Sequence, residues 1–220
     1  MTQEESVLNP TEVRVLGSLV EKQLTTPDYY PLSLNALTIA CNQVSNRDPV
    51  VEFDEPTVMR ALDSLRDRKL AYLYDGAQSR VKRYGHRLAE FYGITPPEVA
   101  ALCVLMLRGP QTVGEIRGRT GRMHDFPALA DADAALDSLA AKVPKPLAAR
   151  LPRQPGMKEQ RCIHLLGGET VPASPVAAAA AAIAPPDEGR LARLEEETAA
   201  LRRELAELRA AFDEFRKSLE

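Results

Sequence analysis

The chain lacks tryptophan, and its aromatic residues, cysteines and histidines are few. Aromatic residues make up 5% of the 220 residues, so we expect a mostly aliphatic core. Cys41, Cys103 and Cys162 are widely spaced and form no C-x-x-C pair, which predicts buried reduced thiols. The three histidines have no spacing that would place two metal ligands on one helical face. We therefore expect no metal site and no cofactor.

Secretory, membrane and catalytic signals are also missing. Residues 1–6 carry two glutamates and no basic residue, whereas a secretory leader needs a positive segment before an apolar one. The longest alanine-rich stretch, 176–184, is too short to span a bilayer. No catalytic triad, paired-carboxylate motif or phosphate loop stands out. We expect a cytoplasmic binding protein that is not an enzyme and has no membrane partner.

What the sequence does contain is an internal duplication. Residues 9–13 read NPTEV and residues 95–99 read TPPEV, and each string has the cap, proline and glutamate that start a helix. The string ALDSL occurs at 61–65 and again at 135–139. Two repeated helices in the same order indicate two copies of one domain, with about twelve extra residues between the repeated helices of the first copy.

Each copy reads as three helices closed by a hairpin. In the first copy we expect a helix over 33–41, another over 54–68, and strands over 70–74 and 80–84. In the second copy we expect a helix over 113–119, a third helix from about 127, and strands over 147–151 and 161–166. This predicts a mainly α fold with small β-hairpins, namely two tandem winged-helix domains (a helix-turn-helix variant) over 1–90 and 91–166. The alternative is two helical domains with incidental hairpins.

Basic charge is concentrated in two segments, although the net charge of the chain is −3. Residues 57–87 hold eight basic and three acidic side chains, and residues 142–161 hold six and one. Arginine can bond guanine, and hydroxyl and basic side chains can bond phosphate oxygens. The candidate nucleic-acid-binding residues, from the third helix of copy one and from both hairpins, are Thr57, Arg60, Ser64, Arg68, Arg80, Lys82, Arg83, Arg153 and Lys158. The other interpretation of the helical ones is an ordinary solvated helix face.

The third helix of the second copy differs in charge. It carries Asp131, Asp133 and Asp137 and no basic residue before Lys142, so its face would repel phosphates. The basic residues of this copy lie around its second helix and on its hairpin. We therefore expect the second copy to contact DNA through the hairpin alone or to contact a protein instead.

The C-terminal part reads as a linker and a coiled coil. Residues 167–188 combine prolines with an alanine run, which is typical of a semi-extended linker. Apolar residues then alternate by three and four over 189–220, with Thr198 as the one interruption. The expected dimerisation residues are Leu191, Leu194, Leu201, Leu205, Leu208, Phe212, Phe215 and Leu219.

The flanking charges of this heptad repeat predict a parallel homodimer. In a parallel pair Glu197 would face Arg202, and Glu204 would face Arg209, whereas an antiparallel pair would bring glutamates together. The alternative is a monomeric helix packed back on the body of the protein.

Three strings, LVEKQLTTPDYYPLSLNALTIACNQVSNRDPV, RMHDF and RLPRQPGMKEQRCIHLLGG, resemble the YceH family of bacterial proteins. The likeness covers residues 8–168 and implies a tandem winged-helix fold, with no established activity, substrate or catalytic residue. It further suggests a family surface made of polar loop residues. These residues are Glu21, Lys22, Thr25, Thr26, Pro27, Asn42, Asn46 and Arg47.

Two functions remain open at this point. The first is a dimeric, regulatory DNA-binding protein, supported by the expected fold and the basic segment 57–87. The second is a protein-interaction scaffold that uses the same domains without DNA, supported by the acidic helix of copy two and by the nearly balanced charge of residues 1–168. Its partner would be an unidentified protein.

Overall fold

The computed structural model of the chain describes residues 7–74, 81–153, 157 and 159–168. In this part of the chain it is mainly helical, with seven α-helices and two small antiparallel sheets of three strands each. These residues belong to one compact unit that ends at Pro172. The expected linker after Gly168, the coiled coil over 189–220 and all of its seam residues lie outside the described residues, so both stay predictions.

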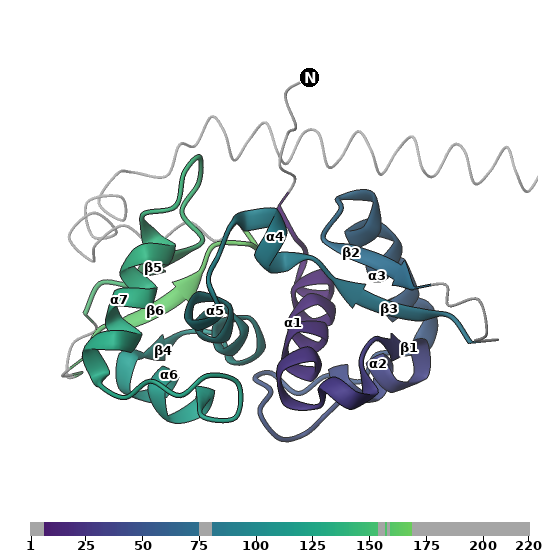
Figure 1. Cartoon of the computed structure of the whole chain (residues 1–220), viewed down its shortest axis with the longest axis horizontal. Coiled ribbons are helices and arrows are strands. Elements are labelled where there is room, and N and C mark those ends of the chain that lie inside the picture. The colour runs from purple at the N-terminus through teal and green to yellow at the C-terminus, as the bar shows by residue number, and fades with distance from the viewer. Residues whose placement is uncertain (1–6, 75–80, 154–156, 158, 169–220) are drawn as a thin grey trace, which may run out of the picture. The chain divides into compact units, whose positions relative to one another are not determined.

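The first half begins with the longest described helix, α1, and ends with a three-stranded sheet in the order β1-β3-β2. A short helix, α4, leads into the second half (Figure 1). The elements are α1 (Pro10–Thr25), the 3-10 turn η1 (Pro27–Tyr29), β1 (Leu32–Ser33), α2 (Leu34–Cys41), α3 (Glu55–Asp67), β2 (Ala71–Tyr74), β3 (Arg83–His86) and α4 (Leu88–Tyr92).

The second half repeats the same order of elements. Its sheet has the order β4-β6-β5, which corresponds strand by strand to β1-β3-β2. The elements are α5 (Pro96–Arg108), β4 (Gln111–Thr112), α6 (Val113–Thr120), α7 (Leu129–Ala140), β5 (Ala148–Arg150) and β6 (Arg161–His164). The duplication that the repeated strings indicated is therefore present in the order of helices and strands.

The expected helix starts are confirmed. The Asn9 side chain accepts a hydrogen bond from the Glu12 amide at 3.0 Å, and the Glu12 carboxylate accepts one from the Asn9 amide at 2.8 Å. At the start of α5 the Glu98 carboxylate accepts hydrogen bonds from the Thr95 amide at 2.6 Å and from the Thr95 hydroxyl at 2.8 Å. Asp54 caps α3 by accepting from the Thr57 amide at 2.9 Å. These bonds satisfy amides that the first turn of a helix leaves without partners.

The strands are shorter or later than expected. In the first sheet β3 runs over Arg83–His86, not over 80–84, because its register follows its pairing with β2, where His86 lies opposite Ala71. This register turns Tyr84 and His86 into the protein, with 2% and 5% of their surface exposed. The two-residue strands β1 and β4 were not expected at all, since an alternating pattern cannot be recognised in two residues.

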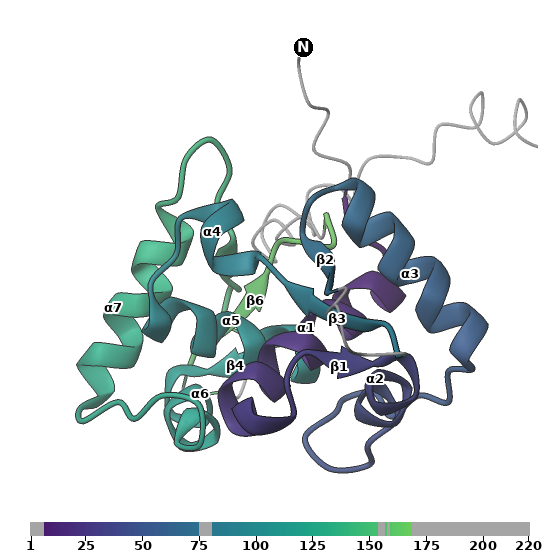
Figure 2. The ribbon, with the colours of Figure 1, turned by 45° about the vertical axis from the view of Figure 1, so that its right-hand side comes forward.

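The two halves share one hydrophobic core, which is centred on the contact between α1 and α5. These helices lie side by side in both ribbon views (Figures 1 and 2). They approach closely at Gly17, whose carbonyl oxygen accepts a hydrogen bond from the Cys103 thiol at 3.5 Å. A Cβ atom at Gly17 would lie 2.9 Å from Cδ2 of Leu107, so glycine permits this approach. As expected, all three cysteines are buried free thiols.

The third helices of the two halves, α3 and α7, lie at opposite ends of this unit (Figures 1 and 2). The loop over 42–54, which is five residues longer than the corresponding loop over 121–128 of the second half, reaches back to α5. The Asp48 amide donates to the Leu107 carbonyl at 2.9 Å, and Arg108 donates to the Asn46 side chain. This longer loop therefore helps to join the halves at the end of α5.

Candidate nucleic-acid interface

The exposed face of α3 presents Arg60 and Thr57 together. The Arg60 guanidinium donates to the Thr57 hydroxyl at 2.9 Å, and Arg60 is exposed while Thr57 and Ser64 are half-buried. The buried residues of the helix are Val58, Ala61, Leu62 and Leu65. Because this apolar stripe fixes the rotation of α3 about its axis, Arg60 is held on the outside of the first half.

Arg68, another candidate, is committed to a contact inside the protein. One guanidinium nitrogen donates to the carbonyl of Val7 at 3.1 Å, and another lies 3.6 Å from the Glu12 carboxylate. The Glu12 side chain is 3% exposed, so Arg68 compensates a buried negative charge at the start of α1. Arg66, which sequence reasoning did not select, is exposed on α3 and pairs with Asp63 at 2.9 Å.

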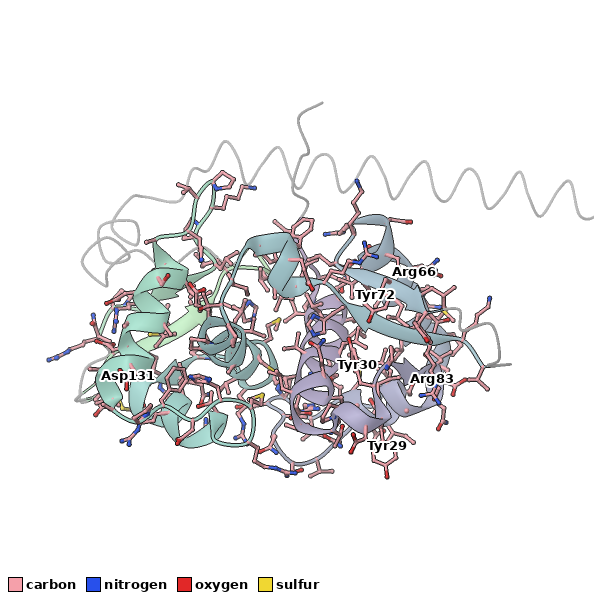
Figure 3. The ribbon with its side chains drawn as sticks, viewed as in Figure 1. Tyr29, Tyr30, Arg66, Tyr72, Arg83 and Asp131 are labelled. Carbon is pink, nitrogen blue, oxygen red and sulfur yellow. The ribbon has the colours of Figure 1, made fainter. Side chains whose placement is uncertain are left out.

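On the hairpin, Lys82 and Arg83 are both exposed, whereas Arg80 lies outside the described residues. Arg83 opens β3, and its guanidinium donates to the Pro31 carbonyl at 3.0 Å. Figure 3 shows Arg66, Tyr72 and Arg83 in the first half, while Asp131 marks the far end of the second half. The structure thus brings Arg60 and the start of β3 onto the same half.

The second half repeats one of these arginine contacts. Arg161 opens β6 as Arg83 opens β3, and it donates to the Pro110 carbonyl at 3.0 Å. An arginine bonded to the carbonyl of a proline that precedes the short first strand therefore belongs to the fold of both halves. Of the two candidates on the second hairpin, Arg153 is exposed and Lys158 lies outside the described residues.

The acidic face of α7 is partly neutralised by the neighbouring strand. One guanidinium nitrogen of Arg150 lies 2.7 Å from a carboxylate oxygen of Asp133 and 2.7 Å from one of Asp137. Hydrogen bonds to Asp137 and Asp133 raise the pKa of Arg150. Arg150 is therefore tied to α7, and Asp131 accepts a hydrogen bond from the Ala128 amide at 2.8 Å as part of the helix start.

The suggestion that Glu21 and Arg47 lie on a polar loop surface is wrong. The Arg47 guanidinium donates to both oxygens of Glu21, at 3.0 and 2.6 Å, and the Arg47 side chain is fully buried. Arg47 also donates to the Ala40 carbonyl at 2.8 Å. Burial opposes ionisation of Glu21, but the hydrogen bonds and charge of Arg47 outweigh it and lower the pKa of the carboxyl.

A second buried arginine, Arg14, was also missed by sequence reasoning. It donates to the carbonyls of Cys41 and Pro49, at 3.2 and 2.6 Å. Both arginines bond the loop over 42–54 to α1, and the two contacts that do so, Arg47 to Glu21 and Arg14 to Pro49, join residues 26 and 35 positions apart in sequence. No local pattern in the sequence could have identified these contacts.

Metal-binding clusters and membrane-spanning helices are both absent from the described residues. In this part of the chain, no three or more histidine, cysteine or acidic side chains are grouped so that they could hold a metal ion. Nor does any helix among the described residues have the length and apolar character needed to cross a membrane.

Comparison with known proteins relates the chain to a bacterial family. A family model described as "Protein of unknown function, DUF480" matches residues 8–157. A UPF0502 protein of Opitutus terrae is 58% identical over 196 residues, which cover 89% of this chain and 84% of the relative. UPF0502 proteins of Azoarcus sp. strain BH72 and Geotalea uraniireducens are 51% and 53% identical; both matches cover 97% of this chain, and 94% and 98% of the relatives. The chain therefore belongs to the DUF480, or UPF0502, family of bacterial proteins.

Proposed function

We propose that the protein is a non-enzymatic, dimeric DNA-binding protein with two tandem winged-helix domains, of which the first reads the duplex. The observation that carries this proposal is the repeated order of three helices with a sheet of order β1-β3-β2, with α3 at the outer end of the first half. In helix-turn-helix proteins the corresponding helix enters the major groove. The resemblance of residues 8–168 to the YceH family supports the same fold.

The charges of the first half fit this role better than those of the second. Arg60 on α3 is exposed, with Thr57 beside it, and in the proposed complex its guanidinium contacts a base edge. Lys82 and Arg83 lie at the start of β3, where a hairpin contacts phosphate oxygens. Arg68 is bonded to Val7 and Glu12, so it is not part of the proposed interface.

The test is a binding titration with a fluorescent random-sequence duplex and the full chain at 50 mM salt. The variant Arg60→Ala/Lys82→Ala/Arg83→Ala should bind at least ten-fold more weakly. Its salt dependence should also be shallower, by about 0.9 in logarithmic slope for each phosphate that the variant no longer neutralises.

The control removes two charges of the second half that lie outside its hairpin, through Arg119→Ala/Arg122→Ala, and is compared with the double variant Arg60→Ala/Lys82→Ala, which removes the same charge from the first half. The control should keep affinity within about two-fold of the unchanged protein, because the proposed groove contacts belong to the first half. Equal decreases in affinity for both variants would indicate non-specific electrostatic attraction to DNA. If the unchanged protein does not bind the duplex at 10 μM, the proposal is wrong.

A protein-interaction role for the second half is the second candidate. It is favoured by the Asp133–Arg150–Asp137 cluster, in which two aspartates of α7 and the guanidinium of Arg150 on β5 are fixed beside one another. A photo-crosslinking residue placed at the exposed Ala134 should then capture a protein partner in cells, and the same residue at Arg60 should not. Absence of any crosslink at Ala134 counts against this role.

The parallel homodimer belongs to the proposal as well and concerns residues outside the described ones. The double variant Leu201→Asp/Leu208→Asp places charge on the expected seam and should give a monomer in sedimentation at micromolar concentration. The control Arg202→Ala/Arg209→Ala removes flanking charges only and should stay dimeric. If the unchanged protein also sediments as a monomer, the prediction of a homodimer is wrong.

A further inference from the structure

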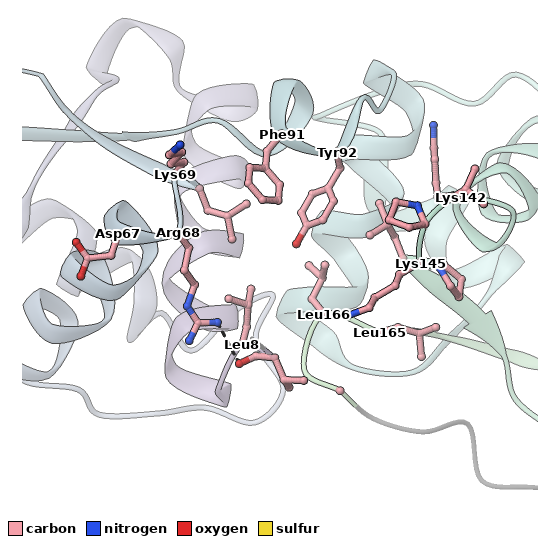
Figure 4. A pocket seen from close by; sticks show the side chains of 17 residues that line it. Leu8, Asp67, Arg68, Lys69, Phe91, Tyr92, Lys142, Lys145, Leu165 and Leu166 are labelled. Carbon is pink, nitrogen blue, oxygen red and sulfur yellow. Dashed lines mark hydrogen bonds between the residues drawn. The ribbon is translucent and has the colours of Figure 1, made fainter. Parts of the chain in front are cut away.

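A pocket of about 480 Å³ opens between the two halves, on the side where the described chain begins and ends (Figure 4). Its floor consists of four buried leucines, Leu8, Leu70, Leu147 and Leu166, from the segment that leads into α1 and from the strand regions of both halves. The volume falls within the ~300–1,000 Å³ typical of small-molecule sites, which occur preferentially where domains meet. The size and the apolar floor fit a small organic ligand.

The floor of the pocket is held in place by backbone hydrogen bonds. The Leu8 amide donates to the Leu166 carbonyl at 2.9 Å, which joins the segment before α1 to the segment after β6. The carbonyls of Leu70 and Leu147 accept from the amides that follow β3 and β6, at 2.8 and 2.9 Å. The four leucines are therefore fixed before a ligand arrives, and binding does not have to order them.

Two cations on the wall of the pocket are compensated by buried carboxylates. Arg68, directly after α3, lies 3.6 Å from Glu12, and Lys142, shortly after α7, lies 3.1 Å from Glu98. Both glutamate side chains are 3% exposed. Lys142 additionally donates to the Gly93 carbonyl at 3.0 Å. These two cations are thus engaged by the protein itself.

The other charged groups of the lining do not favour an ion of either sign. Asp67 and Lys69 carry opposite charges and are both exposed. Lys145 has an interaction of its own within the protein. A charged ligand would therefore give up its hydration above an apolar floor without a surplus of opposite charge to compensate it. This favours an uncharged ligand.

Two adjacent aromatic rings complete the pocket. Phe91 and Tyr92 extend from α4 into the space between the two halves (Figure 4). Their ring centroids are 4.8 Å apart in an edge-to-face arrangement. Such a pair offers an apolar surface to an aromatic or aliphatic group.

From this arrangement we propose that the pocket is a binding site for a small, uncharged organic molecule with an aromatic or aliphatic body. The body lies on the four leucines and against the ring pair, and the paired cations stay with their carboxylates when the ligand binds. The proposal does not depend on DNA binding.

The probe is N-phenyl-1-naphthylamine, an uncharged molecule whose fluorescence rises in an apolar site. The matched probe is 8-anilinonaphthalene-1-sulfonate, which has the same skeleton and a negative charge. With the full chain we expect one bound amine per chain at micromolar affinity and about ten-fold weaker binding of the sulfonate, because the sulfonate would lose hydration without a counterion. Equal or tighter binding of the sulfonate would overturn the proposal of an uncharged ligand.

A pair of variants locates the bound probe. Val143 lines the pocket and is 90% exposed, so Val143→Trp should narrow the site without disturbing the core and weaken binding about five-fold. Val44 is 79% exposed and lies outside the pocket, so Val44→Trp introduces the same side chain elsewhere and should leave binding unchanged. Equal effects of the two variants would place the probe on another surface.

A second pair tests the ring surface. Tyr92→Leu keeps an apolar side chain but removes one ring of the pair, and it should weaken binding of the amine about three-fold or more. The control is Tyr29→Leu, at a tyrosine that is 74% exposed outside the pocket, and it should have no effect. A thermal melt of each variant shows whether the fold is kept. Unchanged binding by a folded Tyr92→Leu would contradict the proposed contact.

The charge of the pocket is tested at Lys69. Its φ is +63°, which asparagine tolerates, so Lys69→Asn removes one charge at little conformational cost. Binding of the uncharged amine should stay within about two-fold, because the ligand makes no ionic contact. A large loss of affinity would show that the pocket recognises charge and would overturn the proposed ligand class.

A direct map of the site decides between the pocket and other surfaces. In the ¹³C-methyl spectrum of leucine-labelled protein, the amine should shift the methyl signals of Leu8, Leu70, Leu147 and Leu166. Shifts confined to other leucines would overturn the proposal. So would the absence of binding to the full chain at 100 μM probe, the result expected if residues 1–6 or the segment after Gly168 filled the pocket.

The DNA and ligand proposals fail separately. Lys82→Ala weakens the proposed DNA contact and leaves the pocket intact, whereas Val143→Trp changes the pocket and leaves α3 and β3 intact. Probe binding with no DNA binding would leave the ligand site standing alone, and DNA binding with no probe binding would remove the ligand site only.

Discussion

Replacing Gly17 by alanine should destabilise the protein, although the same change in the interior of a helix is normally stabilising. Gly17 lies in the middle of α1, where alanine is favoured over glycine by about 1 kcal/mol. The added methyl group would lie 2.9 Å from Cδ2 of Leu107 and 3.2 Å from Cβ of Met106. Both neighbours are buried in α5, so neither can move into solvent.

The magnitude follows from these two opposing effects. Overpacking a well-filled core by one methyl group costs about 1–3 kcal/mol, because neighbouring side chains or the backbone must shift. After subtraction of the gain in helix propensity, Gly17→Ala should lower the free energy of unfolding by roughly 1 kcal/mol. For a chain of this size that corresponds to a decrease in Tm of about 2–4 °C.

Gly118 provides the matched control, because it is also helical but has open space around it. It lies in α6, it is exposed, and a Cβ atom there would meet nothing within 4 Å. Gly118→Ala should therefore raise the free energy of unfolding by about 0.5–1 kcal/mol. Urea unfolding followed by circular dichroism measures both variants. If Gly17→Ala stabilises the protein as much as Gly118→Ala, α1 and α5 are not in close contact and the described core is wrong.

Three further predictions concern buried polar groups. Arg47→Met should cost about 3–5 kcal/mol in urea unfolding by leaving the Glu21 carboxylate buried without its partner, and the double variant with Glu21→Met should recover most of that stability. If the double variant is no more stable than Arg47→Met alone, the unpaired Glu21 carboxylate is not the cause of the destabilisation. Burial lowers the pKa of His86 and His164 to about 4, below the ~6.5 of an exposed histidine, so the unfolded chain binds more protons between these values. The stabilising contribution is therefore fully present above pH 6.5 and is lost as the pH decreases toward 4. His164→Gln should reduce the slope of the free energy of unfolding against pH by at most about 1.4 kcal/mol per pH unit. An unchanged slope would mean that His164 does not titrate in this way. All three cysteines are buried, and burial raises the pKa of each thiol, so the native protein at pH 8 should react with less than about one equivalent of Ellman's reagent, against all three thiols after denaturation. Rapid reaction of the native protein would contradict the described burial.

The sequence predicted the helices well because their signals are local. The caps at Asn9, Asp54 and Thr95 are satisfied by partners three residues away, so the string alone contains both members of each interaction. The duplication was equally visible, since two helices of each half keep nearly the same residues in the same order. The sequence predicted that the hairpin strands exist. It did not predict where they end, because the ends of a strand depend on its pairing with other strands.

The contacts that join the halves could not be predicted in the same way. Arg47 and Glu21 are 26 residues apart, and Gly17 and Cys103 are 86 apart, so no periodicity connects them. A charged residue in a polar loop normally indicates a surface, and for Arg47 this rule failed because its partner is a buried carboxylate. Placing these residues required the tertiary structure.

The buried glutamates of the two capping boxes connect the duplication to the pocket. Glu12 and Glu98 each serve a helix start with one carboxylate oxygen, and each lies near a cation with the other. Removing either cation would leave a buried carboxylate without its compensating charge, so the need for stability alone keeps Arg68 and Lys142 in place. The same two cations line the pocket, one from each half. A cavity with one paired cation from each half on its wall is therefore a consequence of duplicating this helix start.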